Sequence, residues 1–539
     1  MRRAADRIPG GTVGDRDRRA VITVVIAIMT VATLVLTSCT IGPSRRPDLA
    51  ISGGNTTAPT RTSDRQPMPL GPGGPGRTAR PLAWGDCPAT TPRTAPDGTT
   101  FTVRCATLIV PTSYPEPNRG SIELHVAQAR AAETPPGAPP LVVTLGDPGA
   151  VSEASIAATA AALPADIRAH YTIVAMDPRG TGESTPINCV SASTARAILG
   201  MAADPGTPTG TSQLTSITRQ LTFDCGDTAG PALTKINSTN AADDLDSLRS
   251  ALRVDRLSIL ARGGATIGAV YADRYPGRVT AMVLDSPADP TQTLQDRAVA
   301  TATAAQTLLR DFAAACTART GGCPLGDDPV AAITALVHRF ATSGTDAGPW
   351  VMTAGSVLLS LIELLPDPTA WPPLADALAA LGDGNARPLA DLVTGALGGA
   401  DLTARLSARV IYDCNDTTDR LDLRDVAGAV TPARTAAPML GPYAVALSGL
   451  CASWPAPDEA LGRLSGAGAP PIIVIGSVND PVHPFAAARS VASQLASATL
   501  VTWQSGRDGA YPASGCIASI VDDYLLHATV PDRGTLCPP

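Results

Sequence analysis

The sequence is poor in lysine, histidine and aromatic residues, three groups that carry much of protein chemistry. Lys235 is the only lysine among 41 basic residues, and the 539 residues include five histidines and 3% aromatics. The formal net charge of −7 gives no electrostatic basis for nucleic-acid binding. We interpret the excess of arginine as compositional bias and not as a phosphate-binding design. The length allows one large domain with an insertion, or two domains.

The cysteines and histidines also lack the spacing of a metal site. Zinc sites usually bring paired cysteines or histidines together at short, regular intervals. No C-x-x-C pair occurs here, and the histidines are scattered along the chain. We therefore expect no metal and no cofactor.

The N-terminus has the features of an export signal. Three arginines precede an uncharged apolar run from Ala20 to Leu36, which ends in Leu36-Thr37-Ser38-Cys39. This ending resembles a bacterial lipobox, in which the cysteine is lipidated after cleavage. We expect residues 1–39 to be a lipoprotein signal peptide and Cys39 to anchor the chain to the outer face of the cell membrane. An uncleaved transmembrane anchor is the alternative, because the run is about long enough for one.

The other ten cysteines form an even set, which in an exported chain predicts disulfides. Each disulfide that closes a short to moderate loop contributes about 2–4 kcal/mol to the free energy of unfolding. Pairing of nearest neighbours gives Cys87–Cys105, Cys189–Cys225, Cys316–Cys323, Cys414–Cys451 and Cys516–Cys537.

Beyond a Pro/Gly/Ser/Thr-rich tether at residues 40–83, short apolar runs alternate with helical patterns. The alternation predicts an α/β fold with a mostly parallel sheet buried on both faces. Residues 291–460 interrupt it with an all-helical pattern, which predicts a lid between strands six and seven, flanked by core segments 84–290 and 461–539. The eight predicted strands are 101–110, 121–129, 141–145, 171–176, 256–261, 279–284, 471–476 and 498–503.

Several motifs together resemble the actinobacterial secreted tripeptidyl aminopeptidases, which are related to proline iminopeptidase and carry a TAP-like C-terminal region. The resemblance covers about residues 84–539. It implies an α/β-hydrolase fold and a Ser-Asp-His triad that cleaves peptides from a free N-terminus. The motifs are Gly146-Asp147-Pro148-Gly149, the run Asp177–Pro186 (DPRGTGESTP), Asn240–Asp246 (NAADDLD), Trp371 with Leu374–Leu378, Cys414-Asn415-Asp416, Asn479-Asp480-Pro481, and the segment from Cys516 to Cys537.

The turn that should hold the nucleophile contains neither serine nor cysteine. The family places its serine on a G-x-S-x-G turn between a strand and a helix, and the turn here reads ARGGAT from residue 261 to 266. Alignment from either side puts Arg262 or Gly263 at the serine position, and neither side chain can attack a carbonyl. Thr266 is a candidate replacement; its alternative role is an ordinary helix-start residue.

The other catalytic positions are altered as well. Asp480 stands at the position of the triad acid, although a turn aspartate before proline explains it equally well. Asp508 stands at the position of the histidine, where a carboxylate is a poor proton shuttle. His483 is either a relocated base or a solvent-exposed loop residue. Asp147 brings a negative charge to the turn that should stabilise an oxyanion.

These changes favour a catalytically degenerate member that acts by binding. The ligand expected is a peptide or small apolar molecule in the lid cleft, or an envelope protein; the lipid provides the membrane contact, and nucleic acid is excluded. The alternative is an active aminopeptidase or esterase-like hydrolase with relocated residues. We also expect Arg262 to bridge Asp508, Asp480 or both, the alternative being that Arg262 points to solvent and Asp508 caps a turn.

Overall fold

A ten-stranded sheet forms the centre of the computed structural model, which describes residues 79–145, 152–262, 265–348 and 350–539. All of these residues belong to one unit, Pro67–Pro539. The eight predicted strands are present, and each begins and ends within one residue of its predicted position. They are β2 (Thr102–Pro111), β3 (Ser121–Arg130), β4 (Pro140–Leu145), β5 (Thr172–Met176), β6 (Leu257–Arg262), β7 (Val279–Asp285), β10 (Ile472–Ser477) and β11 (Ala498–Trp503).

Two short edge strands complete the sheet, and the sequence pattern does not predict them. They are β1 (Gly85–Asp86) and β12 (Thr535–Cys537), which are too short to leave an apolar pattern. The strand order is β1-β2-β3-β5-β4-β6-β7-β10-β11-β12. The strands from β5 to β12 run parallel, whereas β1, β2 and β3 pair antiparallel with their neighbours.

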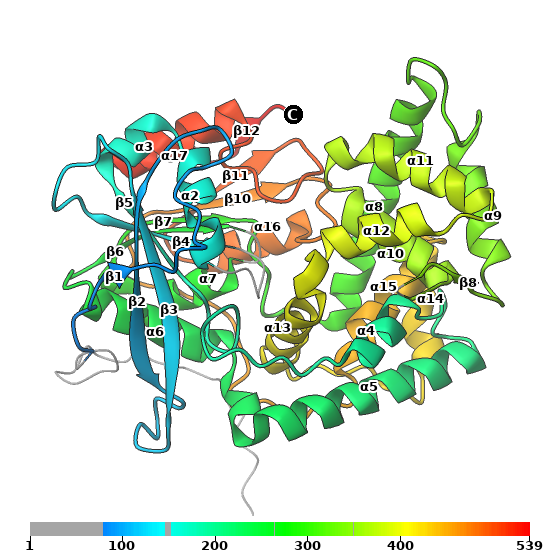
Figure 1. The fold of residues 1–539 in the computed structure, drawn as a ribbon, viewed down its shortest axis with the longest axis horizontal. Coiled ribbons are helices and arrows are strands. Elements are labelled where there is room, and N and C mark those ends of the chain that lie inside the picture. Colours follow the sequence, from blue (N-terminus) through cyan, green and yellow to red (C-terminus); the bar gives the residue numbers. More distant parts are fainter. Residues whose placement is uncertain (1–78, 146–151, 263–264, 349) are drawn as a thin grey trace, which may run out of the picture. The chain divides into compact units, whose positions relative to one another are not determined.

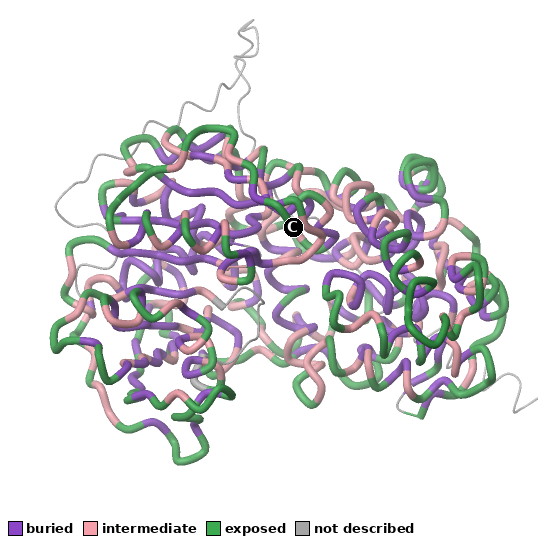
Figure 2. The backbone as a smooth tube through the Cα atoms, turned by 90° about the horizontal axis from the view of Figure 1, so that it is seen from above, coloured by how far each residue is buried: buried purple, intermediate pink, exposed green. Residues whose placement is uncertain are grey.

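Both faces of the sheet are buried, because successive side chains of a strand point to opposite faces. In β10, Ile472 and Val474 join one hydrophobic core, and Ile473 and Ile475 join the other. The strands accordingly form the buried centre of this part of the chain (Figure 2). One face is covered by α2 (Ser152–Ala162), α3 (Ala165–His170) and α17 (Gly515–His527), and the other by α6 (Ser238–Ala251), α7 (Thr266–Arg274) and α16 (Phe485–Gln494).

The helical lid lies between β7 and β10 in the sequence and beside the sheet in space (Figure 1). It contains one short two-stranded ribbon, β8 (Thr345–Asp346) with β9 (Val351–Met352), so the prediction of an all-helical insertion was wrong in this detail. Its helices are α8 (Leu294–Thr317), α9 (Pro329–Arg339), α10 (Ala354–Leu364), α11 (Trp371–Gly382), α12 (Arg387–Ala396), α13 (Leu402–Asn415), α14 (Val426–Ala436) and α15 (Gly441–Ser448).

Two helices from the core segment pack against the lid. They are α4 (Ala192–Leu199) and α5 (Pro208–Ala229), which lie between β5 and β6 in the sequence. The Ser356 hydroxyl on α10 donates to the Leu199 carbonyl at 2.8 Å, and the hydroxyls of Thr218 on α5 and Ser453 lie 3.0 Å apart. The chain before β6 therefore contributes to the lid side of the structure, although the sequence pattern assigns it to the core.

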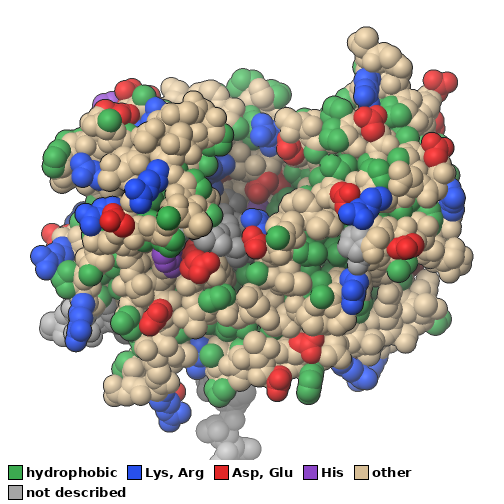
Figure 3. All heavy atoms as spheres, in the orientation of Figure 1, with side chains coloured by type: hydrophobic (Ala, Val, Ile, Leu, Met, Phe, Trp, Pro, Cys, Tyr) green, Lys and Arg blue, Asp and Glu red, His purple; other side chains and the backbone are tan. Residues whose placement is uncertain are grey.

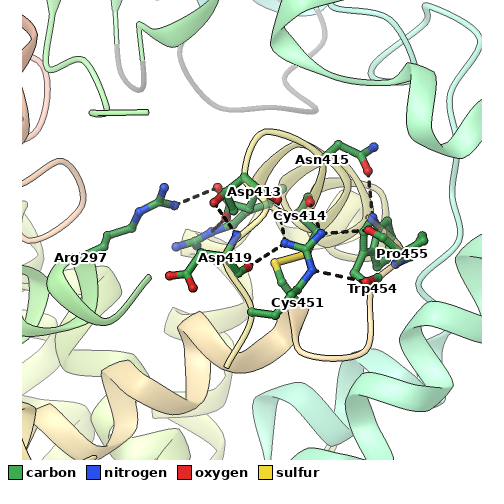
Figure 4. The surroundings of a disulfide bond; sticks show 11 residues. Arg297, Asp413, Cys414, Asn415, Asp419, Cys451, Trp454 and Pro455 are labelled. Atoms are coloured by element: carbon green, nitrogen blue, oxygen red, sulfur yellow. Dashed lines mark hydrogen bonds and ion pairs between the residues drawn. A yellow bond between two sulfur atoms is a disulfide. The ribbon is translucent and has the colours of Figure 1, made fainter. Parts of the chain in front are cut away.

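Five disulfides join the ten cysteines in the nearest-neighbour order that the sequence predicts. Cys414–Cys451 links α13 to the short 3-10 helix Gly449–Cys451 that follows α15, in a dense network of hydrogen bonds (Figure 4). There the Trp454 indole donates to Asn415 at 2.9 Å, and the Asp419 carboxylate accepts from the backbone N–H of Leu294 at the start of α8. Cys39 and the rest of the predicted signal and tether up to residue 78 lie outside the described residues.

A buried ion pair connects several segments of the core with one another and with the lid. Arg179, in the loop after β5, is fully buried and donates to both carboxylate oxygens of Asp244 on α6, at 2.7 and 2.6 Å. Its guanidinium also donates to the carbonyls of Thr112 at 2.9 Å and Lys235 at 3.2 Å, and its own carbonyl accepts from Tyr412 on lid helix α13. Burial raises the pKa of Asp244 by more than Arg179 lowers it, whereas Asp244 raises the pKa of Arg179 despite the burial of the guanidinium, so desolvation and attraction oppose each other within the pair.

This balance predicts a non-additive response to substitution. Arg179→Met and Asp244→Asn should each lower the free energy of unfolding by about 3–5 kcal/mol, because each leaves a buried group without its partner. The double variant should cost clearly less than the sum of the two. Urea unfolding measures all three, with Arg387→Ala, at a pair exposed on α12, as the control. Strict additivity would contradict a coupled pair.

Candidate active-site region

The candidate site lies at the carboxyl ends of four neighbouring parallel strands, the edge at which open α/β sheets bind ligands. Arg262 ends β6 and Asp285 ends β7. Asp480 lies in the turn after β10, and Asp508 in the loop after β11. Because β6, β7, β10 and β11 are adjacent in the sheet, residues far apart in the sequence meet at one edge.

Asp480 shapes the turn that leads into α16. Its side chain is fully buried, and its Oδ1 accepts the backbone N–H groups of Val482 at 2.8 Å and His483 at 3.0 Å. This pattern is the aspartate turn that a short carboxylate forms with the residues following it. Oδ2 is also buried, and no described residue donates a hydrogen bond to it.

His483 and Asp508 form a hydrogen-bonded pair across the two loops. Nδ1 of His483 lies 2.9 Å from Oδ1 of Asp508, and their side chains are 18% and 31% exposed. The structure therefore brings together three residues named from the sequence, Asp480, His483 and Asp508. Of the two predictions for His483, the solvent-exposed loop residue does not fit a largely buried ring bonded to a carboxylate.

The pKa shifts of Asp480, His483 and Asp508 reflect the burial of one imidazole close to two carboxyl groups. Burial raises the pKa of Asp480, and the charge of Asp508 raises it further. Burial acts to lower the pKa of His483, but the charge and hydrogen bond of Asp508 outweigh it and raise the pKa. Burial likewise acts to raise the pKa of Asp508, which His483 lowers instead. An imidazole that holds its proton this firmly is a weak general base at neutral pH.

Asp285 fixes the loop that carries Asp508. It is fully buried, and its two carboxylate oxygens accept the backbone N–H groups of Ala510 at 3.1 Å and Tyr511 at 2.9 Å. Gly509, next to Asp508, has a φ of +74°, a left-handed conformation that favours glycine. Asp285 is not among the site residues predicted from the sequence, where the available signal was an acidic residue at the end of an otherwise apolar strand.

Arg262 does not form the predicted bridge. The partner of Asp508 is His483, and Arg262 makes no ion pair within 4.0 Å with a carboxylate of the described residues. Its Nη2 lies 3.4 Å from the position that a Cβ on Gly509 would occupy, and its charge acts at longer range to lower the pKa of both Asp285 and Asp508.

The remaining predicted site residues are placed only in part. Thr266 is the first residue of α7 and is half-buried, which fits an ordinary helix-start residue. Gly263, the glycine-rich turn 146–149 and its Asp147 lie outside the described residues. A cavity of about 570 Å³ lies instead at the opposite edge of the sheet, at the amino ends of β4, β7 and β10.

Asp285 makes the stability of the fold depend on pH. Burial raises its pKa from 3.8 to about 6, so its stabilising contribution is fully present below pH 3.8 and is lost as the pH rises through about 6. Asp285→Asn cannot titrate. The stability advantage of the native protein over this variant should therefore shrink between pH 4 and pH 7, by on the order of 3 kcal/mol.

Melting temperatures across this pH range measure the effect. The exposed Asp311→Asn on α8 controls for the loss of one carboxylate. Parallel pH curves for the native protein and Asp285→Asn would rule out the titration of Asp285.

Two family models match the chain. Residues 437–537 match the family described as TAP-like protein, and residues 139–340 match the α/β-hydrolase fold family. The first match covers the end of the lid, β10, β11 and the Asp480 and Asp508 loops. The second covers the strands from β4 to β7 and the start of the lid.

Three curated relatives match over most of their length. Carboxylesterase B of Mycobacterium tuberculosis (strain ATCC 25618 / H37Rv) is 30% identical over 455 residues, which cover 81% of this chain and 87% of that protein. Serine protease Hip1 of the same strain is 28% identical, and the match covers 86% of this chain and 92% of that protein. Tripeptidyl aminopeptidase of Streptomyces lividans is 26% identical, and the match covers 85% of this chain and 87% of that protein. The chain belongs to the α/β-hydrolase family with a TAP-like C-terminal region.

Proposed function

We propose that this protein has lost the serine-hydrolase reaction of its family and acts by binding a ligand at the old catalytic edge of the sheet. The observation that carries the proposal is the pairing of His483 with Asp508, beside a second carboxylate and next to a turn without serine or cysteine. A histidine base needs a nucleophile within hydrogen-bond reach. Among the described residues, the hydrogen-bond partner of this imidazole is Asp508.

The space-filling view supports a binding role at this edge. The face seen there is hollowed between the sheet and the lid, and acidic and basic side chains lie around the hollow (Figure 3). A peptide with its own charges, or a segment of an envelope protein, fits such a mixed lining. A small apolar molecule would have to bind deeper, against the lid.

A second candidate function keeps the chemistry. The His483–Asp508 hydrogen bond has the form of the base and orienting acid of a triad, with Nδ1 turned to the carboxylate. This arrangement favours an aminopeptidase or esterase-like hydrolase that uses His483 as a relocated base and Thr266 as its nucleophile. The half-buried position of Thr266 at the start of α7 weighs against it, since a nucleophile in this fold stands at the bend before the helix.

Activity measurements separate the two candidates. We expect the full-length protein, purified in detergent, to leave peptide and ester substrates uncleaved and to resist labelling by a fluorophosphonate probe. The Streptomyces lividans relative, assayed in parallel, controls for the substrates and the probe. Turnover or labelling that disappears in both Thr266→Ala and His483→Ala would establish the hydrolase and contradict the binding role.

We further propose that the protein is held at the outer face of the cell membrane by a lipid on Cys39. No helix in the described part of the chain is long and apolar enough to cross a membrane. A single acyl chain binds membranes only marginally, so stable anchoring needs more than one chain. Metabolic labelling with palmitate should label the native protein and not Cys39→Ala, which should also leave the membrane fraction. Persistent labelling of Cys39→Ala would refute the anchor.

A further inference from the structure

Three potential metal ligands meet in the candidate site. One oxygen of Asp480, one ring nitrogen of His483 and one oxygen of Asp508 all lie within 4.8 Å of one another. They come from the loops that leave two adjacent parallel strands, β10 and β11, so the sheet itself fixes their spacing. All three residues were named from the sequence as candidates for the catalytic site, but not as metal ligands, because their spacing in the sequence matches no metal-binding motif.

The buried carboxylate of Asp480 is oriented but incompletely satisfied. Its Oδ1 is held by two backbone N–H groups, whereas its Oδ2 is buried and receives no hydrogen bond from the described residues. An ionised carboxylate oxygen that is buried and receives no hydrogen bond is costly. In the absence of a cation, Asp480 avoids this cost by keeping a proton, as its raised pKa and its hydrogen bond to Asp508 indicate. A carboxylate that binds a metal is usually oriented by hydrogen bonds from outside the coordination sphere, and the two backbone N–H groups orient Asp480 in this way.

The excess of carboxyl groups around the site also favours the binding of a cation. Asp285, Asp480 and Asp508 gather at this edge, with Arg262 as the nearby arginine whose charge acts on the first and the last of them. Metal binding releases protons from its ligands, so with His483 neutral and Asp480 ionised the three carboxylates and Arg262 carry a formal charge of −2. Arg409, whose charge also acts on His483, is paired with Glu363. One divalent cation would balance the net negative charge of the site, and it would separate two carboxyl groups that otherwise raise each other's energy.

The donor set indicates which cation fits. Imidazole nitrogen suits zinc, copper, iron and nickel, whereas carboxylates alone suit magnesium, calcium and manganese. Zinc binds both donor types at about 2.0–2.2 Å, so two ligands of a tetrahedral site lie ~3.4 Å apart. The 2.9 Å between His483 and Asp508 needs only a small opening to reach this spacing. Three protein ligands would leave the fourth position for water or for a bound molecule.

We propose that Asp480, His483 and Asp508 form a binding site for a divalent transition-metal ion, with Zn²⁺ as the preferred ion. The inference rests on the proposed function, since it names a ligand for the same edge of the sheet. The hydrogen bond between Nδ1 and Asp508 would be replaced by one bond from each residue to the metal, with the imidazole proton on Nε2. The open position would then receive a carboxylate or carbonyl oxygen of a larger ligand.

Titration of the full-length protein in detergent, stripped with EDTA and dialysed, tests the site. Calorimetry with ZnCl₂ should give one saturable site per chain, and Co²⁺ should give visible absorption bands that Zn²⁺ displaces. His483→Ala and Asp508→Asn should each weaken Zn²⁺ binding by more than the roughly 10–100-fold that loss of an outer partner costs. His338→Ala, at an exposed histidine on α9, should bind like the native protein.

The outcomes separate the site from the proposed function. Absence of saturable Zn²⁺ and Co²⁺ binding by the native protein would overturn the metal site and leave the loss of serine chemistry standing. Binding that persists unchanged in both folded variants, as judged by circular dichroism, would also overturn it. Ester or peptide hydrolysis that requires Zn²⁺ and resists the fluorophosphonate probe would support the site and contradict a purely binding role.

Discussion

The buried pair of Arg179 and Asp244 is the interaction on which the arrangement of this molecule most depends. It joins the loop after β5 to α6, and its neighbouring carbonyls come from the end of β2 and from the segment before α6. The Tyr412 hydroxyl, on lid helix α13, connects the lid to this pair by donating a hydrogen bond to the Arg179 carbonyl. Desolvation opposes the attraction within such a pair, and loss of one partner would leave the other charge buried and unpaired.

The parallel sheet then decides where any chemistry can occur. Its strands end at a common edge, so the loops after β6, β7, β10 and β11 are brought together whatever residues they carry. The names of two relatives describe proteolysis and ester cleavage. Here the same edge carries an arginine, three carboxylates and one imidazole, and Asp285 holds the loop of Asp508 in place.

The strands were predictable because each is an apolar run whose burial on both faces needs no information from elsewhere in the chain. The cysteine pairs were predictable because nearest neighbours in the sequence sit on adjacent elements. Asp480 was predictable from its place after β10. The prediction of the Arg262 bridge was wrong, since opposite charges at two loop ends do not reveal which other residue pairs with one of them. That residue is His483, placed by the aspartate turn that precedes it.

The sequence by itself determined the fold class, the positions of the eight long strands, the disulfide order and the absence of serine or cysteine from the turn at residues 261–266. Those properties depend on local patterns of apolar, turn and cysteine residues. The tertiary structure decided the pairing of His483 with Asp508, the burial of the Asp480 carboxyl group, and the packing of α4 and α5 against the lid. These depend on distances between segments remote in sequence, which only the assembled sheet and lid set.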